Sequence, residues 1–259
     1  MTDLNGKAVI ITGASSGIGR TIAIALGAAG AQLWLVGRSS AELSATATLV
    51  EEAGGSAPQL LAADLQERGH LRGLIGEVGS THPHLFAIIN NAGLMHPEPI
   101  MGGTEARWEA MLAVNVMAVL EGLQAAVQAM RAHGKPGHII NIGSIAARWE
   151  EPGVYGATKK MVEGIGASLR RELEQDNIRV TTIVPGGFAT QLARGFQPEQ
   201  LEQVSRSFAE MGLDVSGAGI AKVMSDPQHI ANIILYLLAQ PIDLNIQEIV
   251  IRPPIDTKA

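Results

Sequence analysis

The sequence predicts a single α/β domain over residues 1–259, in which a doubly wound parallel sheet of about seven strands lies between helices. Three observations predict this fold class. Short apolar, β-branched runs alternate with helical patterns along the whole chain. The first such run is followed at once by a glycine-rich turn and a helix. No Pro/Ser-rich linker, low-complexity tract or internal repeat divides the chain, which is long enough for one large domain with its own core.

Composition narrows the class of protein. The chain is 46% hydrophobic, but no apolar run approaches the ~20 residues of a membrane span, and the N-terminus lacks the apolar run of a signal peptide. Cysteine is absent and the seven histidines show no ligand spacing, so we expect neither disulfides nor a metal site. With 19 basic and 25 acidic side chains, the net charge of −6 argues against nucleic-acid binding. We therefore expect a cytoplasmic protein that binds a small molecule and neither nucleic acid nor membrane.

The first strand and its turn form a phosphate-binding pattern. A buried strand is predicted over residues 7–12, and the helix after the turn runs through Ala29. Gly13 permits the tight turn, Gly17 lets backbone amides approach a phosphate, and Gly19 allows the helix to pack closely on the strand. The alternative is a glycine-rich turn that binds nothing. The residues predicted to bind a dinucleotide here are Gly13, Ser15, Ser16, Gly17, Ile18 and Gly19.

The end of the second predicted strand, residues 32–36, bears on the choice of dinucleotide. In such folds a carboxylate near this point holds the ribose 2′-hydroxyl of NAD, whereas an Arg accommodates the 2′-phosphate of NADP. Here the strand runs into Gly37, Arg38 and Ser39, and no carboxylate is present. A guanidinium binds phosphate through a fork of donors. Arg38 and Ser39 therefore predict NADP, with NAD less favoured; the alternative is an ordinary solvated Arg at a helix start.

The remaining elements continue the alternation. Thr104 is expected to cap the helix that begins at Glu105. Polar residues at the carboxyl ends of parallel strands share one edge of the sheet, where ligands bind. Further helices are predicted at 41–53, 71–78, 105–115 or beyond, 153–173 and 227–239, and further strands at 59–63, 86–89, 138–142, 179–184 and 248–251.

Tyr155 and Lys159 carry the clearest chemical signal. Residues four apart share one face of a helix, so a phenol and an ammonium lie side by side. A free phenol has a pKa of about 10, and a nearby positive charge lowers that pKa towards the range useful for acid–base catalysis. The alternative is an amphipathic helix with a buried Tyr and a solvated Lys.

Two further polar residues are candidates for the same site. Ser144 follows the strand at 138–142 and is expected to face the same cleft. Asn115 lies in an apolar helix and therefore needs hydrogen-bonding partners.

Jointly these motifs resemble the classical short-chain dehydrogenase/reductase family, and the likeness covers essentially the whole chain. The resemblance implies a Rossmann fold, with Tyr155 as the acid/base and Ser144 bonded to the substrate oxygen. It implies that Lys159 lowers the Tyr pKa and holds the nicotinamide ribose, and that Asn115 anchors a water of the proton relay. The matching elements are Thr12-Gly-x-x-x-Gly-Ile-Gly19, Asn90-Asn-Ala-Gly93, Ser144 and Tyr155-x-x-x-Lys159.

The same resemblance implies further cofactor contacts and an assembly. A cofactor-binding half is expected over residues 1–142 and a catalytic and substrate half over 143–259. A homodimer or homotetramer is implied, packed through the helices around Asn115 and Met161. The further residues implied to contact the cofactor are Asp64, Leu65, Asn91, Ala92, Gly93, Tyr155, Lys159, Pro185, Gly186, Phe188 and Thr190.

Two departures from the family pattern concern the substrate pocket. Only eleven positions separate Ser144 from Tyr155, and the intervening residues 148–151, Arg-Trp-Glu-Glu, are bulky and charged for a pocket wall. The segment from Pro185 to Pro227 is longer than usual, and within it residues 191–226 begin after the presumed nicotinamide loop, with glycines on both sides of an apolar helical pattern. Residues 191–226 are predicted to be a mobile substrate lid; the alternative is a segment packed permanently on the body or on a partner subunit.

The function predicted from the sequence is an NADP(H)-dependent oxidoreductase that interconverts an alcohol and a carbonyl, with Tyr155 as general acid/base. One alternative is a dinucleotide-binding sensor or scaffold that is catalytically silent. Another is a lyase or epimerase that keeps its cofactor bound. NADPH consumption with a panel of aldehydes and ketones would distinguish the oxidoreductase from the catalytically silent sensor or scaffold.

Overall fold

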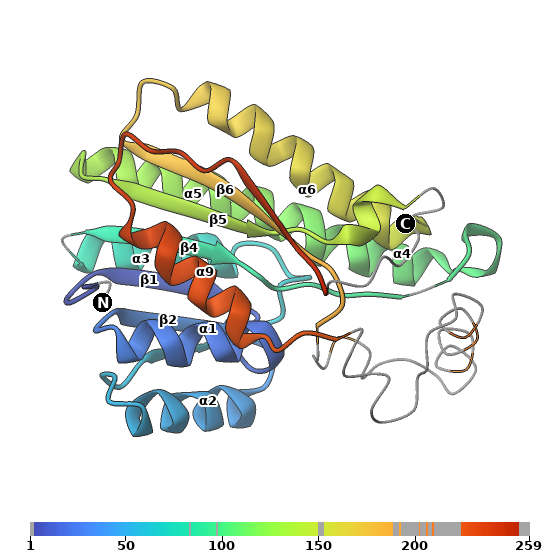
Figure 1. The fold of residues 1–259 in the computed structure, drawn as a ribbon, viewed down its shortest axis with the longest axis horizontal. Helices are drawn as coiled ribbons and strands as arrows, with labels where there is room; N and C mark the ends of the chain where they lie inside the picture. The colour runs from blue at the N-terminus through green and yellow to red at the C-terminus, as the bar shows by residue number, and fades with distance from the viewer. Residues whose placement is uncertain are drawn as a thin grey trace.

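The computed structural model describes residues 3–82, 84–96, 98–149, 153–188 and 224–253, together with residues 192, 202, 206 and 209. Within them lies a seven-stranded parallel sheet of order β3-β2-β1-β4-β5-β6-β7, with helices on both faces (Figure 1). This confirms the predicted α/β class. The strands are β1 (Ala8–Thr12), β2 (Gln32–Gly37), β3 (Gln59–Ala62), β4 (Leu85–Asn90), β5 (Gly137–Ile142), β6 (Ile178–Pro185) and β7 (Glu248–Ile251).

The central strands are covered on both faces. Every residue of β1, β4, β5 and β6 is buried, as expected for parallel strands that helices enclose from two sides. β1 pairs with β2 on one side and with β4 on the other, so the strand order reverses at β1. In open α/β sheets ligands bind outside the carboxyl ends of the strands at such a reversal. The fold thus places the candidate site beyond the ends of β1 and β4.

Two sets of helices supply the two halves of the core. On one face, α1 (Gly17–Ala28), α2 (Ser40–Glu52) and α9 (Gln228–Ala239) bury their apolar side chains against the sheet. On the other face, α3 (His70–Thr81), α5 (Ala118–His133) and α6 (Gly153–Glu172) do the same. Helices on opposite faces are what a doubly wound sheet requires.

The helix predicted to begin at Glu105 is interrupted once. It comprises α4 (Glu105–Leu112), a π-helical turn at Ala113–Met117 and α5. Thr104 occupies the N-cap position as predicted, but the expected capping interaction is wrong, because its side chain makes no capping hydrogen bond. Residues 105–133 are long and apolar enough to cross a membrane by length and composition. In this structure 56% of the apolar window is buried inside the protein, as in a core helix.

Most of the predicted lid at 191–226 lies outside the described residues, as does Thr190. The lid and its fixed-packing alternative therefore stay predictions, as does the division into halves at 142/143. The structure does describe the residues on either side of this segment. Phe188 forms an isolated parallel bridge with Ser225, just before α9. The two borders of the segment are thus held side by side next to β6.

Candidate active site

Three predicted catalytic side chains meet where β5 ends and α6 begins. Ser144 follows β5, and its Oγ accepts a hydrogen bond from the amide of Ala146, 3.2 Å away, in a short 3-10 turn over Ile145–Arg148. Tyr155 and Lys159 lie in the first two turns of α6, and both are buried. The Tyr155 phenol lies near enough to Ser144 for that side chain to favour the charged form of the phenol. The structure therefore places a phenol and a serine hydroxyl where they can bind one oxygen atom.

The electrostatics of this group differ from the sequence-based expectation. Burial raises the pKa of Tyr155 to about 12, opposed by the Ser144 side chain. Burial also lowers the pKa of Lys159 to about 8. Desolvation disfavours the charged form of either group. The predicted lowering of the Tyr155 pKa by Lys159 is therefore not what the polypeptide alone produces: burial raises this pKa, and the opposing contribution comes from Ser144.

The ammonium of Lys159 is held at the end of β5. Its Nζ donates to the carbonyl oxygen of Ile142, 2.9 Å away. A Cβ added to Gly93, after β4, would lie 3.5 Å from the same Nζ. Lys159 is therefore fixed at the end of β5 and lies near the loop after β4, one helical turn from Tyr155.

Asn115 lies fully buried in the π-helical turn. Its Oδ1 accepts from the amide of Leu94 at 2.8 Å, and its Nδ2 donates to the Leu94 carbonyl at 2.9 Å and to Thr158 Oγ1 at 3.0 Å. Thr158 in turn donates to the carbonyl oxygen of Tyr155 at 2.6 Å. The side chain of Asn115 thus joins the loop after β4 to the helix that carries Tyr155, and these bonds supply the partners that the sequence analysis required. Its role as a water anchor stays a prediction.

The glycine turn has the geometry of a phosphate cradle. Gly13 and Gly17 have positive φ angles of 67° and 52°, which glycine adopts without strain. A Cβ on Gly19 would lie 2.2 Å from the carbonyl oxygen of Gly13, so only glycine fits there. Ser16 is the N-cap residue of α1, but its side chain makes no capping bond and the first turn carries no acidic residue. The free amides and the positive end of the helix dipole therefore suit a pyrophosphate, and Ser15 and Ile18 belong to the same turn.

The residues after β4 support this turn. Asn91 Nδ2 donates to the carbonyl oxygens of Thr12 and Gly13, at 2.9 and 3.3 Å. The amides of Asn91 and Ala92 both donate to Thr12 Oγ1, at 3.0 Å each. The side chain of Asn91 therefore anchors the glycine turn, and a cofactor contact by Asn91 would use its main chain. The sequence pattern marked Thr12 only as the start of the glycine motif and gave no sign of this scaffolding role.

The two residues predicted to select NADP lie at the junction of β2 and α2. Ser39 is the N-cap of α2, where its Oγ accepts from the amide of Glu42 at 3.2 Å. Arg38 is exposed, and among the described residues no carboxylate pairs with it. A Cβ on Gly37 would lie 3.1 Å from Ser15 Oγ, so this junction abuts the glycine turn. Arg38 and Ser39 thus follow directly on a residue that packs against the glycine turn.

The other predicted cofactor residues line the same edge of the sheet. Asp64 follows β3, and its Oδ1 accepts from the amide of Gln66 at 3.0 Å, while Leu65 is buried. Pro185 ends β6, and the Gly186 amide donates to Ile251 O at 2.7 Å. Phe188 is buried in the core. Asp64 is therefore bonded within its own turn, and the main chain of Gly186 is bonded to the end of β7.

The guanidinium of Arg148 pairs with two carboxylates. Its Nη2 lies 2.7 Å from Glu248 of β7, and its Nε lies 3.7 Å from Glu163 of α6. The neighbouring Trp149 is half exposed. Carboxylates of β7 and α6 therefore pair with the charge of Arg148, and the bulky, charged pocket wall at residues 148–151 stays a prediction; residues 150 and 151 lie outside the described part of the chain.

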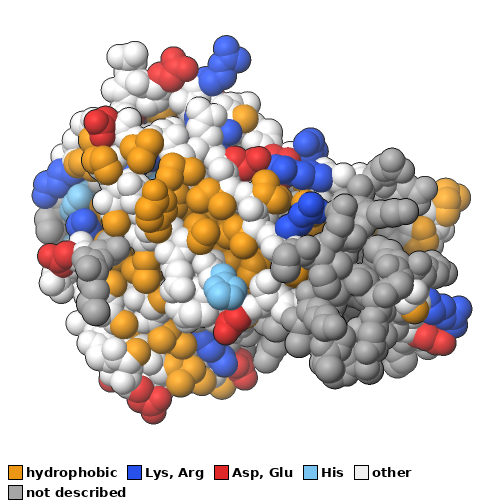
Figure 2. Space-filling model, viewed as in Figure 1, with side chains coloured by type: hydrophobic (Ala, Val, Ile, Leu, Met, Phe, Trp, Pro, Cys, Tyr) orange, Lys and Arg blue, Asp and Glu red, His pale blue; other side chains and the backbone are white. Residues whose placement is uncertain are grey.

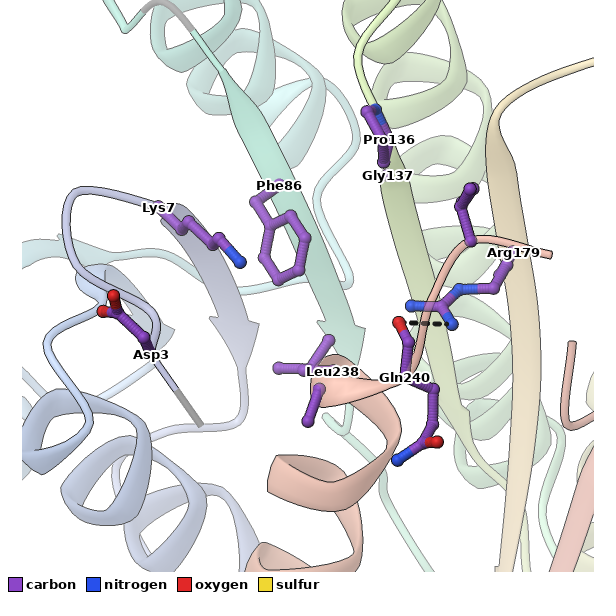
Figure 3. A pocket seen from close by; sticks show the side chains of 10 residues that line it. Asp3, Lys7, Phe86, Pro136, Gly137, Arg179, Leu238 and Gln240 are labelled. Atoms are coloured by element: carbon purple, nitrogen blue, oxygen red, sulfur yellow. Dashed lines mark hydrogen bonds between the residues drawn. The ribbon is translucent and has the colours of Figure 1, made fainter. Parts of the chain in front are cut away.

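A cavity of about 400 Å³ lies at the opposite end of the strands and is distinct from this site. Figure 3 shows Lys7 and Phe86 on one wall and Arg179 on the other, its guanidinium turned towards the end of α9. Arg179 Nη1 donates to the carbonyl oxygens of Gln240, Pro241 and Leu244 at 2.8 to 3.0 Å. The guanidinium caps the carboxyl end of α9, so this cavity has a structural explanation and no predicted site residue lines it.

The geometry agrees with comparisons to known proteins. The model of the short chain dehydrogenase family matches residues 7–201, and the chain belongs to this family of oxidoreductases. An uncharacterized oxidoreductase of Staphylococcus haemolyticus is 32% identical over 98% of this chain and 100% of its own length. An uncharacterized oxidoreductase of Listeria innocua is 33% identical, over 96% of this chain and 97% of its own.

Solved structures give the same result. A metagenomic short-chain oxidoreductase in complex with NADP superimposes with a TM-score of 0.77 and 29% identity, covering 97% of this chain and 99% of that one. A 3-oxoacyl (acyl-carrier-protein) reductase from Agrobacterium tumefaciens with NADP bound gives a TM-score of 0.80 and 26% identity, covering 96% and 94%. The predicted family and Rossmann-type fold are therefore confirmed.

Proposed function

We propose that the protein is an NADP(H)-dependent oxidoreductase that interconverts an alcohol and a carbonyl, with Tyr155 as the general acid/base. The observation that carries the proposal is the buried Tyr155 phenol, next to Ser144 and one turn from Lys159, at the sheet edge that bears the glycine turn. A silent sensor or scaffold has no need of a buried acid–base pair at this point. Cytoplasmic location stays a prediction.

Ser144, Tyr155 and Lys159 have different roles in binding the substrate oxygen and in transferring its proton. When bound, the nicotinamide supplies or accepts the hydride. The hydroxyls of Ser144 and Tyr155 are donors fixed in advance for the oxygen that gains negative charge as a carbonyl is reduced. Tyr155 gives its proton to that oxygen, and takes it back when an alcohol is oxidised. The Lys159 ammonium, held on Ile142 O, adds positive charge beside the phenolate that forms.

The chain offers a continuous set of groups to the cofactor. The amides of the glycine turn would hold the pyrophosphate, and Arg38 with Ser39 the 2′-phosphate. Asp64 and Leu65 would flank the adenine, while Lys159 would bond the nicotinamide ribose. The direct test is NADPH oxidation with a panel of aldehydes and ketones. Cofactor binding with no turnover on any of them would favour the sensor alternative.

We expect replacement of Arg38 to weaken NADPH binding selectively. Arg38→Ala removes one charge-assisted contact to the 2′-phosphate, worth about 1.5–3 kcal/mol, and should leave NADH binding nearly unchanged. Adding Gly37→Asp should turn the preference to NADH, at some cost in stability because the new Cβ would lie 3.1 Å from Ser15. Fluorescence titration of both cofactors measures the ratio of dissociation constants.

The control for Arg38 is Arg171→Ala, which removes an exposed positive charge from the last turn of α6. It should leave both dissociation constants as they are. Equal affinity of the unmodified protein for NADPH and NADH would refute the cofactor assignment.

We propose a homodimer or homotetramer packed through α4, α5 and α6. Leu112, Leu120 and Met161 expose large apolar side chains on these helices. A second apolar group lies on the face that carries α9 and β7 (Figure 2), where Tyr236 and Val250 are 54% and 42% exposed. Apolar patches on a folded surface mark contact sites.

The assembly is testable by light scattering. Leu120→Glu should lower the particle mass, since a carboxylate in a subunit interface loses its hydration. Leu49→Glu is the matched control, because Leu49 is exposed to a similar degree on α2. A monomeric unmodified chain would contradict the proposal.

A further inference from the structure

The junction of β2 and α2 contains an incomplete helix cap. In a capping box, Ser at the N-cap accepts from the amide three residues on, and a Glu at that position returns its carboxylate to the N-cap amide. Ser39 and Glu42 have this spacing. The first half is formed, since Ser39 Oγ accepts from the Glu42 amide at 3.2 Å. The second half is not: the Glu42 carboxylate lies 2.7 Å from Arg20 Nη2 of α1.

Arg20 is held in place by more than Glu42. Its Nη2 donates to the carbonyl oxygen of Ser15 at 2.5 Å, and its Nε donates to Thr46 Oγ1 at 3.0 Å. The fully buried Thr46 donates to the carbonyl oxygen of Ala14 at 3.0 Å. The guanidinium is thus fixed between the glycine turn and α2, and it draws the Glu42 carboxylate to the α1 side.

The position of the Glu42 carboxylate matters because it is the acidic group in the first turn of α2. If it completed the capping box, it would lie at the Ser39 amide, next to Arg38. There it would neutralise Arg38, repel a 2′-phosphate and offer an acceptor to a free ribose 2′-hydroxyl. Those are the properties of a site that prefers NAD.

We propose that Arg20 is a specificity-determining residue, which preserves the 2′-phosphate site by holding the Glu42 carboxylate away from Arg38 and Ser39. Arg20 acts through Glu42 and is a positioning residue. The inference rests on the NADP preference proposed above. It predicts that Arg20 affects the adenosine end of the cofactor only when Glu42 carries a charge.

Two nucleotides without nicotinamide, which differ only in the 2′-phosphate, test this separately from catalysis: adenosine 2′,5′-bisphosphate and AMP, with dissociation constants from calorimetry. The unmodified chain should prefer the bisphosphate. Arg20→Gln should reduce that preference about tenfold, because the released Glu42 carboxylate then neutralises Arg38, the cation beside the 2′-phosphate. Arg20→Gln with Glu42→Gln should restore it, although the Ser15 and Thr46 contacts are lost in both variants. Glu42→Gln alone should leave the preference unchanged, and Arg20→Lys, which keeps a cation for Glu42, should retain most of it.

The outcomes are distinguishable. If Arg20→Gln and the double variant share one ratio of dissociation constants, Arg20 acts only by supporting the glycine turn and the inference is overturned. If the unmodified chain binds both nucleotides equally, the NADP proposal fails first and the inference fails with it. Thermal unfolding of the two variants, compared at one pH, shows whether they are equally folded; an unfolded Arg20→Gln protein leaves Arg20→Met, with and without Glu42→Gln, as the pair to compare, because Met also removes the cation that holds Glu42. The inference then predicts the higher bisphosphate preference for the variant without the carboxylate, and an equal ratio overturns it.

Discussion

Tyr155→Phe should lower kcat by about 10²–10⁴-fold, the usual contribution of a general acid/base. The change removes one hydroxyl from a buried side chain and almost no volume, so the fold and the glycine turn should be unaffected. The Ser144 hydroxyl would remain but would have lost its neighbour. The dissociation constant for NADPH should therefore stay close to that of the unmodified protein, and single-turnover kinetics should show the loss in the chemical step.

The chain provides its own control for this experiment. Tyr236, the other tyrosine, is 54% exposed on α9, and Tyr236→Phe should leave kcat unchanged. A Tyr155→Phe protein that keeps most of its kcat would remove Tyr155 from the mechanism. A protein that loses NADPH binding together with turnover would show that the hydroxyl supports the site rather than the proton transfer.

The predicted parts of the site are those that a local pattern specifies. The spacing of Tyr155 and Lys159 places both on one face of α6, and the strand–glycine–helix order places Gly13 and Gly19 at the sheet edge. Parallel strands bring their carboxyl ends to one edge, so the approach of Ser144 to Tyr155 also followed from the element order. These features depend on short segments and on the strand order.

The features that escaped prediction depend on partners far along the chain. The sequence required partners for Asn115, but the Leu94 main chain that supplies two of them becomes adjacent only in the folded state. The same holds for Arg148, whose carboxylate partner is on β7, and for Arg20. The direction of the Tyr155 pKa shift also escaped, because a nearby Lys159 was visible in the sequence while the extent of burial was not.

Lys159→Met should abolish most turnover and yet stabilise the fold at neutral pH. Burial lowers the pKa of Lys159 from 10.5 to about 8, so the folded chain carries this charge at a cost of about 3 kcal/mol. Met fills a similar volume without a charge, although Ile142 O loses its donor, at about 1–2 kcal/mol. The net gain at pH 7 should be roughly 1–2 kcal/mol in the free energy of unfolding, read from urea titration.

The pH dependence of that gain identifies its origin. Between about pH 8 and 10.5 the unfolded chain binds more protons at Lys159 than the folded chain, so the stability of the unmodified protein rises with pH across this window. The burial cost is present in full below pH 8 and disappears above 10.5. The advantage of Lys159→Met should therefore shrink as pH rises towards 10, and only the loss of the Ile142 contact should remain.

Lys160→Met is the matched control, because its side chain is 67% exposed and pairs with Glu163. A pair of this kind contributes about 0–1 kcal/mol, so Lys160→Met should show neither the gain nor its pH dependence. A Lys159→Met protein that is less stable than the unmodified one at pH 7 would mean that the buried ammonium is a net stabilising group. A stabilised protein with intact turnover would place Lys159 outside the reaction, whereas stability gained as activity is lost is what a charge buried for catalysis predicts.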